Sequence, residues 1–115
     1  EAYQAIASAR GLLRDAARKH DAGLANAVEV NVAKVAASQA LSLAVDSAIQ
    51  VYGADGLSSL TPLSGIYRAA RATHILDGTD DALVSAVGRR LLDAYQDVDS
   101  LDFDWPSLPG NPAER

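Results

Sequence analysis

Hydrophobic residues recur every three or four positions along most of the chain, which is the repeat of an α-helix. The pattern predicts four helices, which cover about residues 2–20, 24–52, 62–76 and 80–96. Apolar stripes with this repeat leave polar residues on the opposite faces, as in helices that pack side by side. The predicted fold class is therefore all-α, an antiparallel helical bundle.

Short turns separate the predicted helices, and each turn carries residues that end or begin a helix. Gly23 is suited to a left-handed C-terminal stop for the first helix, and residues 53–56 break the second. Thr61 and Pro62 suit the N-cap and the first position of the third helix. Thr79 is the predicted cap of the fourth, whose first turn is acidic and so matches the helix dipole.

The longest predicted helix, residues 24–52, is apolar on almost every side. Its polar residues form a single narrow stripe that contains Asn31, Lys34, Ser38, Ser42, Asp46 and Gln50. A helix of this kind lies at the centre of a bundle or against another subunit. The remaining helices are too few to cover it, so we expect further domains, oligomerisation or both.

Composition narrows these possibilities. The 115 residues allow one domain at most, and about one residue in five is alanine, whereas aromatic residues make up only 5%. This predicts a core of small side chains between closely spaced helices. A net charge of -5 without a basic face argues against binding to nucleic acid. The chain has no cysteine, which excludes disulfides, thiolate zinc sites and thiol catalysis, and it shows no metal-ligand spacing.

No segment is expected to cross a membrane, because the least charged long stretch, residues 35–54, still contains serine, glutamine and aspartate. The sequence shows no basic region followed by an apolar one, as a secretory signal would have. A cytoplasmic location is therefore the default expectation.

Residues 97–115 differ in character from the predicted helical domain at residues 1–96. Aspartates alternate with apolar residues as far as Trp105, and prolines follow. We interpret this segment as an acidic, proline-rich tail that lies in a strand-like conformation on the helices or on a neighbour. A docking peptide for a separate partner is the alternative.

Two of the turns could carry chemistry. Residues 53–56 offer glycines that would let the backbone approach a phosphate, although helix-ending glycines are common without any ligand. Asp77 precedes the N-terminus of a helix, where it could serve as a catalytic base or simply as a turn residue. His20 and His74 are interpreted as structural, with a supporting role for His74 beside Asp77 as the alternative.

The order of these segments resembles the C-terminal domain of acyl-CoA dehydrogenases. Residues 48–56 correspond to the family's A-L-Q-x-x-G-G-x-G stretch, residues 66–71 to its R-D-A-[KR] helix and residues 75–79 to its I-x-E-G-T turn, without gaps. Residues 32–37 and 10–13 fit the helices that precede these motifs. The resemblance covers most of the chain and implies a partial four-helix bundle domain that lacks its first helix.

The resemblance also implies a reaction, the removal of hydrogens from Cα and Cβ of an acyl-CoA thioester, as in fatty acid metabolism. Asp77 stands at the position of the family's base, which takes the α-proton while FAD accepts a hydride, and Gly78 would contact the substrate. The residues implied to contact FAD are Gln50, Gly53, Ala54, Gly56 and Thr79. The first four would face the FAD of a neighbouring subunit.

Flavin sites that are shared in this way imply a dimer or a dimer of dimers, either homomeric or heteromeric. An electron-transfer protein would act as the acceptor. Arg68 and Arg71 are expected to pair with carboxylates or to lie near the anionic cofactor.

Several positions depart from the family pattern. Asp77 replaces the usual glutamate, as in a branch of the family with a D-G-x-D-E turn. Ala54 replaces a glycine, Asp55 would repel a phosphate, and Leu83 replaces a glutamine that contacts the cofactor. Two alternatives therefore stay open. One is a flavin-dependent monooxygenase of the same fold, which needs no α-proton base, and the other is a degenerate helical subunit without catalytic function.

Overall fold

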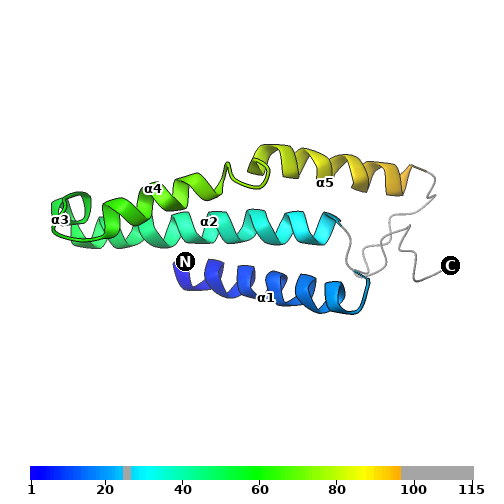
Figure 1. The fold of residues 1–115 in the computed structure, drawn as a ribbon, viewed down its shortest axis with the longest axis horizontal. Helices are drawn as coiled ribbons and strands as arrows, with labels where there is room; N and C mark the ends of the chain where they lie inside the picture. The colour runs from blue at the N-terminus through cyan, green and yellow to red at the C-terminus, as the bar shows by residue number, and fades with distance from the viewer. Residues whose placement is uncertain (25–26, 97–115) are drawn as a thin grey trace.

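The computed structural model describes residues 1–24 and 27–96, and these residues form helices and turns without any strand. The helices are α1 (Ala2–Asp21), α2 (Ala27–Tyr52), α3 (Ala54–Leu57), α4 (Leu63–Thr73) and α5 (Asp80–Tyr95) (Figure 1). The predicted all-α fold class is therefore confirmed. The tail predicted at residues 97–115 lies outside the described residues.

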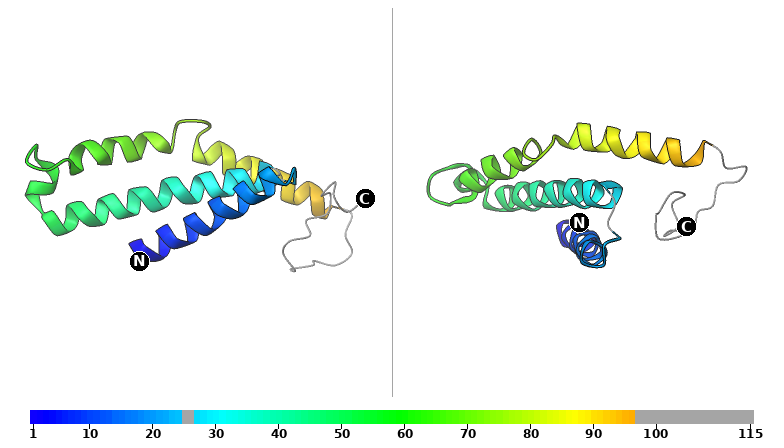
Figure 2. Two further views of the ribbon diagram at one scale, coloured as in Figure 1. Left: turned by 60° about the horizontal axis from the view of Figure 1, so that its bottom comes forward. Right: turned by 45° about the vertical axis from the view of Figure 1, so that its right-hand side comes forward.

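The long helix α2 lies in the middle of the structure. Figures 1 and 2 show α1 along one side of α2, with α4 followed by α5 along the opposite side. α4 lies beside the C-terminal half of α2 and α5 beside its N-terminal half, and all three neighbours run antiparallel to α2. The radius of gyration is 17.6 Å, whereas a compact domain of this length would have about 13 Å. The described helices thus form an elongated, open layer rather than a closed bundle.

The core between these helices consists of small side chains, as the alanine content predicts. The buried apolar residues are Ala9, Ala16, Val28, Ala33, Val35, Ala40, Val45 and Ala70. Small residues at the contacts let the helix axes approach closely. Many larger apolar side chains stay exposed in this chain, including Val51, Leu57, Leu60 and Leu92, each more than two-thirds exposed. That other domains or subunits cover them remains a prediction.

An ion pair joins the end of α1 to the start of α2. The ammonium group of Lys19 forms a hydrogen bond to a carboxylate oxygen of Glu29 and lies 3.1 Å from a carboxylate oxygen of Asp15. The hydrogen bond with Glu29 outweighs partial burial and raises the pKa of Lys19 above its ordinary value. This contact ties the C-terminal end of α1 to the first turn of α2.

Three predicted helix boundaries need correction. The third helix was expected to reach residue 76, but α4 ends at Thr73 because the backbone leaves the helical region soon afterwards, with φ of 55° at Asp77 and 94° at Gly78. α4 also begins one residue later than predicted, since Pro62 occupies the N-cap rather than the first helical position. The predicted start of α2 at residue 24 is one turn early, because α2 begins at Ala27 and residues 25–26 lie outside the described part.

The predicted break at residues 53–56 contains a short helix that the sequence pattern did not reveal. Gly53 ends α2 with φ 61° and ψ -138°, a conformation that only glycine adopts without strain. The chain then turns directly into α3. By contrast, the predicted cap at Thr79 is confirmed, because its hydroxyl oxygen accepts a hydrogen bond from the backbone N–H of Ala82 at 3.3 Å.

The expectation that no segment could cross a membrane was too strict for α2. This helix is long and apolar enough to span a bilayer, judged by length and composition alone. The central helix of a bundle meets the same two criteria. In the structure, α2 packs between α1 and the α4–α5 pair, which bury 28% of its most apolar stretch.

Gly56 in α3 is buried against the last turns of α2. A Cβ atom on Gly56 would lie 3.0 Å from the Cα of Ile49 and 3.1 Å from its carbonyl oxygen. Both are backbone atoms of a helix and cannot move aside. The close approach of α3 to α2 therefore depends on the absence of a side chain at this position.

Replacing Gly56 by alanine should lower the free energy of unfolding by about 1–3 kcal/mol, because the added methyl group would push α3 away from α2. Gly65→Ala in α4 is the matched control. A Cβ atom there would meet nothing within 4 Å, so this change should stabilise by about 0.5–1 kcal/mol. Chemical denaturation of the complete protein measures both effects, and a shift of the same sign for the two variants would contradict the packing argument.

Candidate functional site

The turn between α4 and α5, residues 74–79, is fixed to α2 through the carboxylate of Asp80. One carboxylate oxygen accepts a hydrogen bond from Nζ of Lys34 at 2.7 Å. The other accepts from Oγ of Ser38 at 2.8 Å and lies 2.6 Å from Nδ1 of His74, which donates to it. The backbone N–H of Asp80 also donates to the carbonyl oxygen of His74 at 3.0 Å, which closes the turn.

The carboxylate of Asp80 is largely removed from water, with a side chain only 13% exposed. Burial by itself would raise the pKa of Asp80 because it disfavours the charged form. The hydrogen bonds from Lys34, Ser38 and His74 outweigh this effect and hold the pKa of Asp80 below its ordinary value. The charged carboxylate is thus the form that the fold stabilises. We call Lys34, Ser38, Ser42, His74 and Asp80 the Asp80 cluster.

Ser42 extends the Asp80 cluster by one hydrogen bond, because its Oγ lies 2.7 Å from Nε2 of His74. Serine, histidine and aspartate therefore follow one another in the order that serine hydrolases use. Two features favour a structural role. Ser42 lies in the middle of α2, where the backbone N–H groups are used within the helix and cannot stabilise an oxyanion. Asp80 is already shared with Lys34 and Ser38 rather than reserved for His74.

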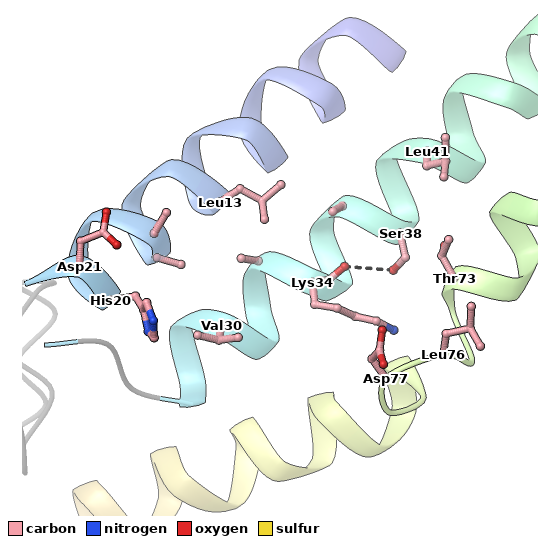
Figure 3. Close-up of a pocket in the computed structure, with 14 residues that line it drawn as sticks. Leu13, His20, Asp21, Val30, Lys34, Ser38, Leu41, Thr73, Leu76 and Asp77 are labelled. Carbon is pink, nitrogen blue, oxygen red and sulfur yellow. Dashed lines mark hydrogen bonds between the residues drawn. The ribbon is translucent and has the colours of Figure 1, made fainter. Parts of the chain in front are cut away.

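Asp77 lies at the outer edge of the same turn and is exposed. Its φ of 55° makes it the one non-glycine residue of the described chain with a left-handed backbone. It borders a groove of about 660 Å³ that runs between α1 and α2 up to the turn. The groove walls are mostly apolar, with Leu13, Val30, Leu41 and Leu76 among them (Figure 3).

Charged groups lie at the rim of this groove rather than along its walls. Lys34 reaches from α2 toward the turn that carries Asp77, and His20 and Asp21 lie at the end of α1 (Figure 3). The arrangement places a carboxylate at the edge of an apolar cavity. Such a cavity suits a ligand with a hydrocarbon part and a reactive group next to it.

Thr79 lines a second, more polar cleft of about 540 Å³. Arg71, His74, Asp80 and Asp81 also line this cleft. The turn therefore presents Asp77 to the apolar groove and Thr79 to the polar cleft. Arg68 and Arg71 were both expected to pair with carboxylates or to lie near an anionic cofactor. Both are exposed on α4, and Arg71 lines this cleft together with Asp80 and Asp81.

The other predicted cofactor contacts lie at the far end of α2. Gln50 is 12 residues beyond Ser38, which corresponds to about 18 Å along the helix axis. Gln50, Gly53 and Ala54 are exposed there, whereas Gly56 is buried against Ile49. Within the described part of the chain these residues and Asp77 do not form a single site. Their assignment to two different flavin sites stays a prediction.

Gly78 and Leu83 have structural contacts. The carbonyl oxygen of Gly78 accepts a hydrogen bond from Nζ of Lys34 at 3.0 Å. A Cβ atom on Gly78 would lie 3.1 Å from a methyl group of Leu83, which therefore packs under the turn. The leucine that replaces a family glutamine thus fills space beneath Asp77 and Gly78. Among the described residues, no group of three or more metal-ligating side chains is placed to hold a metal ion.

A comparison with family models decides the identity of this domain. The model described as "Acyl-CoA dehydrogenase, C-terminal domain" matches residues 1–92. The chain belongs to the acyl-CoA dehydrogenase family. The match extends over all five helices except the last turn of α5.

Relatives with this name occur in animals and bacteria. The human acyl-CoA dehydrogenase family member 11 is 42% identical over 59 residues, which is 51% of this chain and 8% of the human protein. Cyclohexane-1-carbonyl-CoA dehydrogenase of Geobacter metallireducens is 32% identical over 87 residues, or 76% of this chain and 23% of that enzyme. An acyl-CoA dehydrogenase of Bacillus subtilis is 34% identical over 85 residues, or 74% of this chain and 22% of the relative. This acyl-CoA dehydrogenase domain thus spans less than a quarter of these relatives, and no solved structure matches it.

The Asp80 cluster is the part of the site that sequence analysis missed. The signal was present in the polar stripe of α2, because Lys34, Ser38 and Ser42 are four residues apart and so share one face of the helix. A buried stripe of this kind needs polar partners on another element. His74 and Asp80 lie on the two sides of the turn between α4 and α5, but nothing local joins them to a helix more than 30 residues earlier.

Asp80→Asn should lower the free energy of unfolding by about 2 kcal/mol at neutral pH, because the charged hydrogen bonds to Lys34 and His74 are lost. A lowered pKa means that this stabilisation is fully present above the ordinary value of 3.8 and is lost as the pH falls through the lower value of the folded state. The gap between the wild-type protein and the variant should therefore shrink below about pH 4. Denaturation of the complete protein between pH 3 and 7 measures it.

Asp81→Asn is the control for this experiment, since Asp81 is the next residue of α5 and its side chain is exposed. Its effect on stability should be small and should change little with pH. A pH-independent gap for Asp80→Asn would show that the carboxylate charge contributes nothing to the turn.

Proposed function

We propose that this domain supplies the proton-abstracting turn of a flavin-dependent acyl-CoA dehydrogenase, with Asp77 as the base. The observation that carries the proposal is the position of Asp77 at the rim of the apolar groove between α1 and α2. Family membership supports an oxidoreductase acting on acyl-CoA thioesters, and the bacterial relative named cyclohexane-1-carbonyl-CoA dehydrogenase is one such enzyme by its name.

The groove and the carboxylate suit the two parts of an acyl thioester. The acyl chain lies along the apolar walls formed by Leu13, Val30 and Leu41, and its α-carbon lies next to Asp77. Asp77 takes the α-proton, and loss of a hydride from Cβ leaves a double bond between the two carbons. The backbone N–H of Asp77 donates to the thioester oxygen, on which negative charge develops as the proton leaves.

FAD, when bound, supplies the acceptor for the hydride. The exposed end of α2 fits part of this cofactor, because Gln50 presents a carboxamide and Gly53 and Ala54 leave their surroundings open. Asp55 is exposed beside them and disfavours a phosphate, so these residues are assigned to the adenosine portion. Thr79 approaches the cofactor from the polar cleft, whereas Gly56 acts indirectly by holding α3 on α2.

The two groups of residues serve two different flavin sites, which makes the enzyme an oligomer. The distance between Gln50 and the Asp77 turn along α2 and α4 supports this division. Exposed apolar residues around α3, such as Val51, Leu57 and Leu60, supply surface for a neighbouring subunit. In this proposal the subunits assemble as a dimer of dimers, and an electron-transfer protein accepts the electrons from the reduced flavin.

Asp77→Asn should abolish reduction of the flavin by substrate, because an amide cannot accept the α-proton. The complete protein is mixed anaerobically with a panel of acyl-CoAs, and bleaching of the flavin absorbance is followed. Wild-type protein should bleach with at least one member of the panel. The Asn variant should bind the same acyl-CoA but reduce the flavin at least about a thousandfold more slowly.

The alternative functions predict different results in this experiment. Bleaching that persists in Asp77→Asn would reject Asp77 as the base. A complete protein that contains flavin but bleaches with no acyl-CoA would favour a monooxygenase of the same fold. A complete protein that contains no flavin and bleaches with no acyl-CoA would favour a degenerate subunit, for which Asp55 and Leu83 are the supporting departures.

Asp55→Asn should tighten FAD binding by up to about fivefold, because it removes one exposed negative charge near the anionic cofactor. Asp93→Asn on α5 is the matched control, since Asp93 is also exposed but lies away from α3. Titration of the apoprotein with FAD measures both affinities. Equal affinities for the two variants would count against FAD binding beside α3.

A further inference from the structure

Lys34 binds the Asp77 turn at two points. Its ammonium group donates to the carbonyl oxygen of Gly78 at 3.0 Å and to a carboxylate oxygen of Asp80 at 2.7 Å. These two acceptors lie immediately after Asp77 in the chain. Lys34 also borders the groove that Asp77 faces, and its side chain is only 23% exposed (Figure 3).

The conformation of the turn requires contacts from other parts of the chain. A left-handed backbone at a non-glycine residue costs free energy, and it persists only where the surroundings impose it. Asp77 is exposed and makes no contribution of its own to the packing of the turn. The bonds that impose the conformation therefore come from its neighbours, through Lys34 on Gly78 and through the Asp80 cluster at the start of α5.

Asp80 also determines which carboxylate the ammonium group of Lys34 pairs with. An ammonium group beside a groove that holds a catalytic carboxylate could pair with that carboxylate and block it. Lys34 instead donates to the carbonyl oxygen of Gly78 and to the carboxylate of Asp80, so its ammonium group is already engaged. The remaining charged groups around the groove are His20 and Asp21 at the end of α1.

We propose that Lys34 is a positioning residue for proton abstraction, which it serves by fixing the backbone of the Asp77 turn to α2 without touching the substrate. Asp80 is its partner and engages the ammonium group, which therefore forms no ion pair with Asp77. The inference rests on the proposed function of Asp77. It adds that a residue of α2 fixes the position of the Asp77 carboxylate. Misplacement of a catalytic group by about 1 Å is enough to slow a reaction by about a hundredfold.

Lys34→Met tests this inference in the complete, flavin-loaded protein, and Lys19→Met is a closely matched control. Both lysines pair with carboxylates and are similarly buried, with side chains 23% and 25% exposed, but Lys19 joins α1 to α2 away from the turn. Two readouts are needed. One is hydrogen exchange of the backbone amides of residues 75–79, and the other is the rate of flavin reduction by an α-deuterated and an ordinary acyl-CoA.

Lys34→Met should speed amide exchange in the turn by at least about tenfold, because two charge-assisted hydrogen bonds are lost. It should slow flavin reduction by about a hundredfold and raise the deuterium isotope effect, while acyl-CoA binding changes by less than about threefold. Lys34→Arg keeps the charge and should recover part of both losses. Lys19→Met should change none of these quantities.

Equal behaviour of Lys34→Met and Lys19→Met in exchange and in reduction would overturn the inference. If Lys34→Met does not fold, Asp80→Asn takes its place, and the same two readouts decide. Flavin reduction that survives in Asp77→Asn would reject the proposed base instead, and the exchange measurement would still report whether Lys34 holds the turn.

Discussion

The carboxylate of Asp80 is the contact on which the arrangement of this domain depends. It is the first residue of α5, yet its hydrogen bonds reach two residues of α2 and the histidine at the end of α4. A buried carboxylate without these donors would be strongly unfavourable, and the donors themselves would be unsatisfied without it. These hydrogen bonds therefore fix three features together: the direction of α5, the shape of the preceding turn and the position of α4 on α2.

Features that depend on one or two turns of chain could be predicted from the sequence. The helical repeat predicted the helices that became α1, α2, α4 and α5, and the threonine before two aspartates predicted the start of α5. Alanine content predicted a core of small side chains. These signals are local, because capping and amphipathic repeat act within a few residues. The position of Asp77 in a turn ahead of a helix was predicted for the same reason.

Features that arise from contacts between distant segments could not be predicted in this way. The short helix α3 exists because Gly53 turns sharply and Gly56 fits against Ile49, and neither requirement is visible in a pattern of apolar residues. α4 ends next to His74, whose ring lies within hydrogen-bond distance of Ser42 and Asp80 on other helices. Lys34 and Asp80 are 46 residues apart, so the sequence placed both on helices without indicating that they meet.

The small side chains of the core have a consequence for the life of the protein in a cell. Alanine and valine bury little surface each, so the helices described here gain little stability from one another. Large apolar side chains meanwhile remain on the outside of a single copy. If the proposed neighbouring domains or subunits cover these side chains, a newly made copy is the form most exposed to chaperones and proteases until that contact forms. Substitutions far from Asp77, on those outer faces, would then reduce the amount of enzyme rather than its turnover.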